Sequence, residues 1–352
     1  MAPVVKALRT AQMPVRLVST GQHTTLVEES LKYFDLKPDV NLRLMKADQT
    51  PLSFLTRAIA ALDKLFDKGG VDVVLAQGDT TSVAAASIVC FHRKIPFGHI
   101  EAGLRTHDLL QPWPEEWNRR VASVGAAWHF APTGTAVDNL RHEGIPVSQI
   151  YETGNTVVDA LQYILKVKPA QLELAGVPSA YKDYVLLTCH RRENLGQPMV
   201  DAFTAIADYA SGHPELEFWY PTHPNPVVQK TAHQIFGGLK NVRITQALDY
   251  LSFVHAMNYC RLVISDSGGV QEEAPSLGKR VIVLRNVTER PEGVEAGFCY
   301  LTGTDRARIT QALDALLAAE ALPRVISPYG DGRAANRIVK ILQNAGVTGV
   351  CA

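Results

Sequence analysis

Hydrophobic and polar positions form runs of two lengths along the chain, and this pattern predicts parallel sheets covered by helices. Short runs rich in Val, Ile and Leu are typical of buried strands, and the longer amphipathic stretches between them are typical of helices. In the first half, strands are predicted at 15–19, 71–76, 96–100 and 127–130, with helices near 24–34, 50–67, 81–92, 114–126 and 132–143. In the second half, strands are predicted at 184–188, 216–220, 241–244, 261–265 and 280–284. Regular alternation of this kind predicts an α/β fold with a separate sheet in each half.

A break in this pattern divides the chain into two predicted domains. The stretch near 164–183 carries two prolines and no clear strand, so we place the linker there. The predicted N-terminal lobe covers 1–165 and the predicted C-terminal lobe covers 166–332, followed by a last helical stretch at 333–345. The first residues predict a helix, whereas a doubly wound domain normally opens with a strand.

Composition and charge exclude several classes of protein. The 352 residues carry 35 Lys+Arg and 35 Asp+Glu, and zero net charge argues against binding to nucleic acid, which depends on neutralising phosphates. The apolar runs are far too short to span a membrane. The N-terminus lacks the apolar core of a signal peptide, so we expect a soluble, cytoplasmic protein. The cysteines are odd in number and scattered, which suggests neither a disulfide framework nor a zinc site: Cys90, Cys189, Cys260, Cys299 and Cys351.

The segment 261–284 predicts a strand that turns through Ser-Asp-Ser-Gly-Gly into a helix. Gly268 and Gly269 would let the backbone approach an anion, the first N–H groups of the helix would point at it, and Ser267 would add a hydroxyl. Glu273, one turn later, is placed to accept hydrogen bonds from ribose hydroxyls. The alternative is an ordinary turn with a capping serine.

Cationic and histidine side chains follow the other strands of the second half. His190 and Arg191 come after the strand at 184–188, and His223 comes after the next. Arg290 lies in a polar loop after the strand at 280–284. Ligands of open α/β sheets bind at such carboxyl ends, so these groups suit a phosphate or a leaving group, although solvated loops are the alternative.

Three carboxylates are predicted to share one edge in the first half. Asp79 and Glu101 follow the strands at 71–76 and 96–100, and Glu115 opens a helix after Pro114. Asp79 is also a possible cap of the next helix, and acidic residues are generally favoured in a first helical turn. As a set, however, they suit acid/base chemistry on a nucleotide-linked substrate. No clustered His, Asp or Cys spacing predicts a metal site.

Taken together and in order, these motifs resemble the non-hydrolysing UDP-N-acetylglucosamine 2-epimerases along nearly the whole chain. The runs that carry the resemblance are QGDTTSVAAAS (77–87), HIEAGLRT (99–106), PWPEEWNRR (112–120), GNTVVDAL (154–161), HRRENLG (190–196), YPTHPNP (220–226), SDSGGVQEEAPSLGK (265–279) and TERPEGVEAG (288–297). Each run alone is modest evidence, whereas their joint occurrence in order is highly specific.

The resemblance implies a fold, an assembly and a reaction. The fold is two Rossmann-like lobes of the glycosyltransferase B type with the active site in the cleft between them, and a terminal helix that returns to the first lobe. The implied assembly is a homodimer. The implied reaction interconverts UDP-N-acetylglucosamine and UDP-N-acetylmannosamine without a cofactor, by eliminating UDP to give 2-acetamidoglucal and adding it back, as a step towards cell-surface polysaccharides. Reprotonation on the other face of the sugar requires more than one acid/base group.

The resemblance also implies roles for matched residues. Asp79, Glu101 and Glu115 form the acid/base and sugar-positioning set, and His190, with Arg191 and His223 nearby, assists departure of UDP. In the second lobe, Ser267, Gly268 and Gly269 hold the diphosphate, Glu273 holds the ribose, and Phe253 and Arg290 hold the uridine and phosphate.

The sequence departs from the family at its start and at one regulatory position. Family members begin with a strand and the loop Gly-Thr-Arg-Pro-Glu-Ala-Ile-Lys before Met-Ala-Pro, where this sequence starts. We expect that this first strand and the loop after it are missing. Together they amount to on the order of 10–15 residues. Without them, the polypeptide would have an exposed sheet edge and would be poorly active. Because an exposed edge is a folding liability, we favour a start codon assigned too late over a truncated paralogue as the explanation. The allosteric site of the family's bacterial members resembles Gln22, His23 and Arg57 of this sequence. At the position of that site's second glutamine, this sequence has Thr25.

Other functions remain open at the level of sequence. A relative acting on UDP-2,3-diacetamido-glucuronate would share the motifs, and a hydrolysing epimerase would release free N-acetylmannosamine. A glycosyltransferase of the same architecture would not need the three carboxylates of the first lobe. A degenerate UDP-sugar-binding protein would bind UDP without proton exchange at C2.

Overall fold

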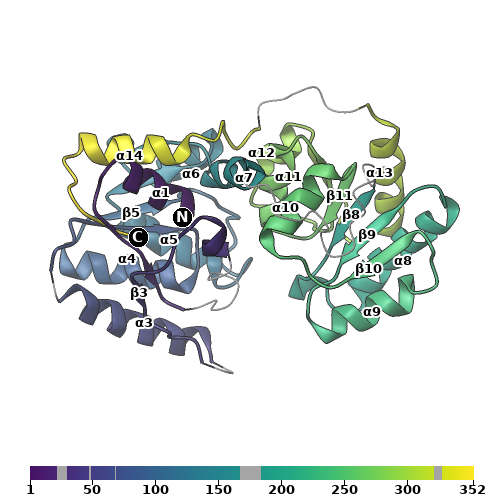
Figure 1. Ribbon diagram of the computed structural model, residues 1–352, viewed down its shortest axis with the longest axis horizontal. Helices are drawn as coiled ribbons and strands as arrows, with labels where there is room; N and C mark the ends of the chain where they lie inside the picture. The colour runs from purple at the N-terminus through teal and green to yellow at the C-terminus, as the bar shows by residue number, and fades with distance from the viewer. Residues whose placement is uncertain (22–29, 47–48, 68, 167–183, 321–326) are drawn as a thin grey trace. The chain divides into compact units, whose positions relative to one another are not determined.

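The computed structural model describes residues 1–21, 30–46, 49–67, 69–166, 184–320 and 327–352, which form two compact units (Figure 1). Unit 1 comprises Met1–Gln162 and Tyr329–Ala352, and unit 2 comprises Tyr163–Pro328. Each unit contains a six-stranded parallel sheet. Most of the predicted linker at 164–183 lies outside the described residues, and its first residues belong to helix α7 (Thr156–Lys166).

The sheet of unit 1 has the strand order β1-β14-β4-β5-β6-β7, and a separate pair joins β2 to β3. The strands are β1 (Val15–Arg16), β2 (Val18–Ser19), β3 (Val40–Asn41), β4 (Val73–Gln77), β5 (Phe97–Ile100), β6 (Trp128–Ala131), β7 (Ile150–Glu152) and β14 (Val350–Cys351). The helices whose bounds lie within the described residues are α1 (Ala2–Thr10), α3 (Pro51–Phe66), α4 (Thr81–Arg93), α5 (Glu115–Gly125), α6 (Gly134–His142), α7 and α14 (Ala334–Asn344), with a 3-10 turn η1 (Val147–Gln149).

Successive side chains of β4 face two different hydrophobic cores of unit 1. Val73 and Leu75 pack with α1 and α14, whereas Val74 packs with α3, α4 and α5 on the other face. Successive side chains of a strand point to opposite faces, so one apolar strand supplies both cores. The terminal helix α14, yellow in Figure 1, therefore covers the sheet of unit 1 beside α1, purple in the same view.

The C-terminal strand β14 lies inside the sheet, between β1 and β4. Val350 pairs with Val15 on one side and Val73 on the other. The N–H of Val18 donates to the carbonyl of Ala352 at 2.7 Å. The edge of β4 is thus covered by a strand from the other end of the chain. Two residues are too few to show a strand period, which is why the sequence did not indicate β14.

The sheet of unit 2 has the strand order β10-β9-β8-β11-β12-β13. Its strands are β8 (Val185–Thr188), β9 (Phe218–Pro221), β10 (Val242–Thr245), β11 (Leu262–Ser265), β12 (Arg280–Val283) and β13 (Cys299–Leu301). Its helices are α8 (Gln197–Gly212), α9 (Pro226–Phe236), α10 (Tyr250–Tyr259), α11 (Gly268–Ser276), α12 (Pro291–Glu295) and α13 (Arg306–Ala318), with a 3-10 turn η2 (Arg192–Asn194). Ile264 faces α8, α9 and α13, and its neighbour Val263 faces α10 and α11.

The α/β prediction is confirmed, and so are the strands expected from apolar runs. The segment 15–19 is divided between β1 and β2, which belong to different sheets. The short strands β3, β7, β13 and β14 were not predicted, because two or three residues carry no readable period. The predicted helix near 24–34 lies largely outside the described residues. All strand pairs of the two large sheets are parallel, so the polar segments after neighbouring strands meet at one edge of each sheet.

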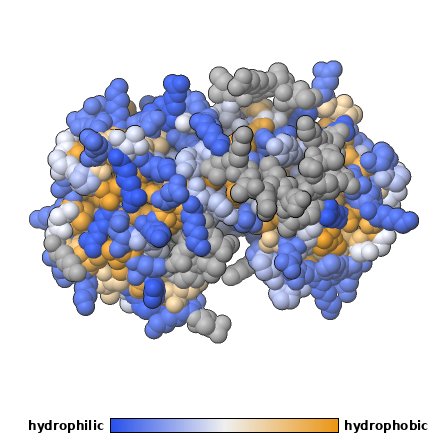
Figure 2. Space-filling model, viewed as in Figure 1, coloured by the Kyte–Doolittle hydropathy of each residue, from blue (hydrophilic) through white to orange (hydrophobic). Residues whose placement is uncertain are grey.

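The visible face of both units is mainly hydrophilic, with smaller hydrophobic patches among the blue residues (Figure 2). Within the described residues, no helix combines the length and the apolar character needed to cross a bilayer.

Candidate functional site

Asp79 lies in the turn between β4 and α4 and is bound by helix α5. Its carboxylate forms an ion pair with Arg119, and its carbonyl accepts a hydrogen bond from the side-chain amide of Asn118 at 2.9 Å. The residue at the cap position of α4 is Thr80, so the alternative of Asp79 as a helix cap is wrong. Helix α5 thus holds this carboxylate in place at the carboxyl end of β4.

Glu101 follows β5, the strand next to β4, and has a left-handed backbone with φ of +66°. Few residues other than glycine adopt this conformation, and it is concentrated at turns and functional sites. A Cβ built on Gly78 would lie 3.3 Å from Oε2 of Glu101, so this carboxylate faces the turn after β4. Asp79 and Glu101 therefore flank the same turn.

Two adjacent glutamates at the start of α5 have different surroundings. Glu115 is half-buried, whereas Glu116 is fully buried and accepts from the backbone N–H of Thr106 at 3.1 Å and from Nη1 of Arg119 at 3.2 Å. Arg119 consequently links Glu116 to Asp79. Sequence reasoning missed Arg119, although its spacing three residues after Glu116 on a helix is a signal for such a pair.

In unit 2, two arginines meet at the N-terminus of α11. A Cβ built on Gly268 would lie 2.8 Å from Nη1 of Arg290 and 3.3 Å from Nη2 of Arg191. Ser267 occupies the cap position of α11, as the alternative expected, although its side chain makes no capping hydrogen bond. Gly269, the next residue, has Oγ of Ser267 as its nearest neighbour, 3.9 Å from a Cβ built there. The N–H groups of a helix N-terminus beside two guanidinium groups make a site for a polyanion.

Arg290 is held by two buried carboxylates and is not a solvated side chain. Its Nε donates to Oε1 of Glu272 at 2.5 Å, and its Nη1 forms an ion pair with Glu289. Only 11% of the Arg290 side chain is exposed. A second arginine, Arg285, pairs with Glu289 at 3.0 Å. This network fixes the guanidinium of Arg290 beside the anion-binding turn.

Glu273 is buried one turn into α11 and is held by helix α10. The hydroxyl of Tyr250 donates to its Oε1 at 3.2 Å. Burial raises the pKa of Glu273 to about 7, against the opposing effect of this hydrogen bond. Phe253, on the same helix as Tyr250, is half-buried against the adjoining core. A buried carboxylate with spare acceptor capacity is well suited to ribose hydroxyls.

His190 and His223 stack on each other at the carboxyl ends of β8 and β9. Their ring centroids are 5.3 Å apart and the ring planes differ by 15°. Burial lowers the pKa of His190, while the carboxylate of Asp266, 3.6 Å from its Nδ1, acts in the opposite direction. Asp266 was missed by sequence reasoning, although it lies between the two serines of the Ser-Asp-Ser-Gly-Gly run.

The predicted allosteric set is only partly described. Gln22 and His23 lie outside the described residues. Arg57, on α3, donates to the carbonyl of Leu44 at 3.2 Å and to the side chain of Gln49. Across the described part of the chain, no group of three or more His, Cys, Asp or Glu side chains is arranged to hold a metal ion.

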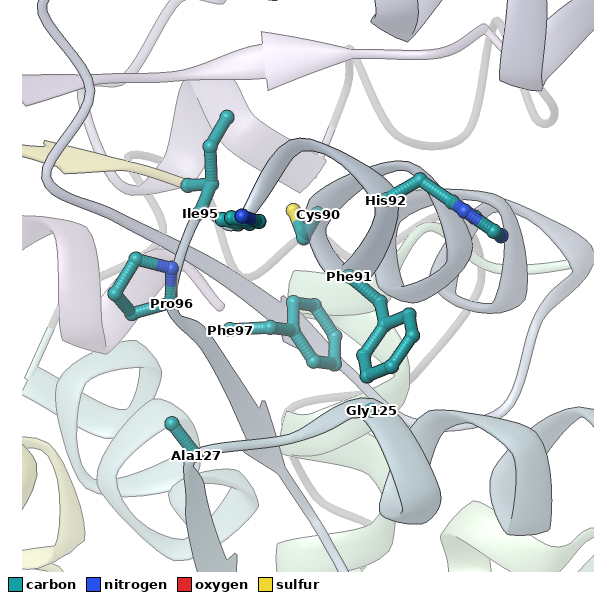
Figure 3. Close-up of a pocket in the computed structure, with 9 residues that line it drawn as sticks. Cys90, Phe91, His92, Ile95, Pro96, Phe97, Gly125 and Ala127 are labelled. Atoms are coloured by element: carbon teal, nitrogen blue, oxygen red, sulfur yellow. The ribbon is translucent and has the colours of Figure 1, made fainter.

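A pocket of about 530 Å³ lies away from these residues, at the amino end of β5 (Figure 3). Phe91 and Phe97 line it, with Gly125 at the end of α5 and Ala127 just before β6. Glu101 follows the opposite, carboxyl end of β5. None of the candidate residues lines this pocket.

Comparison with known proteins adds a match along nearly the whole chain. Residues 6–343 match the family model described as UDP-N-acetylglucosamine 2-epimerase. The chain is 41% identical to the Escherichia coli K12 protein of that name, covering 98% of this chain and 95% of the relative. It is 42% identical to the Bacillus subtilis protein of the same name, covering 97% and 91%.

Solved structures agree with this match. A Neisseria meningitidis UDP-GlcNAc 2-epimerase bound to UDP-GlcNAc has a TM-score of 0.90 at 39% identity, covering 98% of this chain and 96% of that one. A Methanocaldococcus jannaschii structure in complex with UDP-GlcNAc and UDP has a TM-score of 0.86 at 31% identity, covering 97% and 95%.

Proposed function

Because this chain belongs to the UDP-N-acetylglucosamine 2-epimerase family, we propose that it interconverts UDP-N-acetylglucosamine and UDP-N-acetylmannosamine. The observation that carries the proposal is the pair of carboxylates, Asp79 and Glu101, that flank the turn after β4. Inverting a carbon centre through proton exchange requires acid/base groups in place on both faces of the sugar.

The proposed reaction proceeds by elimination, because the proton at C2 of the sugar is not acidified by an adjacent carbonyl. A carboxylate takes this proton as a C1–C2 double bond forms and the C1–O bond breaks, and UDP leaves with the electron pair. The intermediate is 2-acetamidoglucal. An acid then protonates C2 from the opposite face, and an oxygen of UDP attacks C1 to restore the bond.

Residues of unit 1 would carry out the proton transfers in this scheme. Asp79, Glu101 and Glu115 are the proposed acid/base and sugar-positioning groups. The ion pair with Arg119 supports a role for Asp79, because it fixes the carboxylate in one orientation.

Residues of unit 2 would hold UDP in the same scheme. Arg191, Arg290 and the first turn of α11 bind the diphosphate, and Glu273 accepts from the ribose. Phe253 contacts the uridine, and His190 with His223 stabilises the leaving diphosphate. The cationic groups that meet at Gly268 support this assignment, since they would favour the charge that develops on UDP.

A proton-exchange experiment tests the proposal directly. The chain is incubated with UDP-N-acetylglucosamine in D2O, and C2 is followed by NMR. Deuterium incorporation with formation of UDP-N-acetylmannosamine is expected. Free sugar would indicate hydrolysis, and UDP binding without exchange would leave only a binding protein.

Matched variants make this test specific to the site. Glu101→Gln should lower the exchange rate by about a hundredfold or more. Glu152→Gln removes an exposed carboxylate from the same unit and should leave the rate unchanged. Equal rates in the two variants would contradict the proposed role of Glu101.

We also propose that the chain is a homodimer that supplies a precursor of cell-surface polysaccharide. Sedimentation velocity at micromolar concentration tests the assembly, and a monomeric mass would contradict it.

A further inference from the structure

Asp266 is a fully buried carboxylate that joins two segments of the candidate site in unit 2. It follows β11 and directly precedes the turn into α11. Four donors of one loop converge on its Oδ2, and the backbone N–H of His190 also reaches Oδ1 at 3.1 Å. They are Sγ of Cys189 at 3.1 Å, the backbone N–H of His190 at 3.0 Å, the backbone N–H of Arg191 at 2.8 Å and Nδ2 of Asn194 at 3.0 Å.

These contacts compensate the cost of burying a charge. An ionised carboxylate in a protein interior is costly unless its oxygens accept several hydrogen bonds. Burial raises the pKa of Cys189 well above its ordinary value, so its sulfur keeps the proton that it donates. Asn194 donates to the carbonyl of Leu284 as well, at 3.1 Å, which ties the same loop to the end of β12.

The loop that Asp266 holds carries two of the proposed UDP-binding groups. His190 has its ring 3.6 Å from Asp266 and stacks on His223. Arg191 reaches the space beside Gly268, on the helix that begins two residues after Asp266. A displacement of the loop would therefore move a histidine and a guanidinium away from the anion-binding turn together.

We propose that Asp266 is a positioning residue, which fixes His190 and Arg191 for binding the diphosphate of UDP. It acts through the loop without touching the substrate, and the inference rests on the proposed function. An amide at this position can keep one oxygen for the four donors at Oδ2, but it turns an N–H₂ donor towards the backbone N–H of His190 at Oδ1, so that contact is lost together with the negative charge.

Asp266→Asn tests this role against a matched control. The control is Asn241→Asp, because the buried side chain of Asn241 bonds three carbonyls of unit 2 away from the site, those of Ala210, His213 and Leu216. Calorimetry measures UDP binding, and NMR follows the titration of His190. Asp266→Asn should weaken UDP binding about tenfold or more, whereas Asn241→Asp should lower stability alone.

The titration of His190 is a second readout that loss of stability does not move. His190 faces the negative charge of Asp266 and the positive charges of Arg191 and, when protonated, His223. Removal of the negative charge leaves the two repulsive neighbours, so the His190 midpoint should shift to lower pH in Asp266→Asn. An unchanged midpoint together with unchanged UDP affinity would overturn the inference.

Asn194→Ala provides an independent variant where Asp266→Asn does not fold. It removes one donor to Asp266 and leaves the carboxylate, so UDP binding should weaken several-fold, and wild-type affinity would overturn the inference. Failure of the unaltered protein to bind UDP would overturn the proposed function as well. Binding by the unaltered protein with no change in the variants would overturn only the role of Asp266.

Discussion

A single methyl group at Gly268 has no room, because the space beside its Cα is taken by two guanidinium groups. Arg290 has no freedom to move aside, since its Nε and Nη1 are paired with Glu272 and Glu289. The UDP binding proposed for unit 2 thus depends on the absence of a side chain at Gly268 and on the ion pairs that hold Arg290 in place.

Gly268→Ala should weaken UDP binding about tenfold or more, because the added Cβ displaces Arg290 or breaks its ion pairs. Calorimetric titration with UDP measures the effect. Gly134→Ala is the control, since a Cβ at Gly134, the first residue of α6, meets nothing within 4 Å. Equal affinity in both variants would show that the crowding at Gly268 does not matter.

Glu273 should make the stability of the protein depend on pH. Its pKa is raised to about 7 in the folded state from 4.5, so its stabilising contribution is present below pH 4.5 and is lost as pH rises through 7. Glu273→Gln should therefore gain up to about 3 kcal/mol of unfolding free energy relative to wild type on going from pH 4.5 to pH 8.

Urea denaturation at several pH values measures this gain. Glu215→Gln is the control for the change in net charge, because Glu215 is an exposed carboxylate of the same unit. Parallel stability curves for Glu273→Gln and wild type would rule out the raised pKa.

At the scale of elements, strand β14 joins the two ends of unit 1. It lies between β1 and β4, and its side chains enter both cores of the unit, Val350 with α1 and α14 and Cys351 with α3 and α4. Outside the sheet, Thr348 donates to the carboxylate of Asp72, just before β4. The last residues of the chain are thus part of the framework that supports Asp79 and Glu101.

Val350→Asp should destabilise unit 1 by about 3 kcal/mol or more, since it buries a carboxylate without a partner in the sheet. Chemical denaturation measures the loss. Val147→Asp makes the same change at a side chain that is 63% exposed and should alter stability by about 0.5 kcal/mol or less. A small effect at Val350 would contradict the pairing of β14.

At the scale of the whole molecule, the two units carry different halves of the proposed chemistry. Unit 1 holds the carboxylates, and unit 2 holds the arginines, the anion-binding turn and Glu273. Zero net charge over the chain agrees with groups of both signs in each unit, such as Asp79 with Arg119 and Arg290 with Glu272. Each unit has its own hydrophobic cores, so substitutions in one unit should leave the framework of the other intact.

Variants in the two units should therefore separate UDP binding from proton exchange. Asp79→Asn should keep UDP affinity within about twofold and lose most exchange at C2, because the proposed UDP-binding residues belong to unit 2. Arg290→Gln should weaken UDP binding about tenfold or more. Calorimetry and NMR exchange on the same samples measure both, and a loss of UDP affinity in Asp79→Asn would contradict this division.

The sequence by itself determined the α/β class, the long strands and most of the candidate residues. Apolar runs such as those of β4 and β11 carry a local signal, because a strand buried on both faces must be apolar throughout. Residues at strand ends, such as Glu101 and His190, were found because their place follows from the strand before them.

Only the tertiary structure decided which of these residues have partners and which are held by others. Arg119 contacts Asp79, 40 residues away in the chain, and Asp266 contacts His190, 76 residues away. Strand β14 pairs with β4, more than 270 residues away. Such contacts leave no periodic pattern, because a salt bridge or a two-residue strand depends on where the chain returns in space. The alternative of a solvated loop for Arg290 was decided in the same way, by its ion pair with Glu272, 18 residues away in the chain.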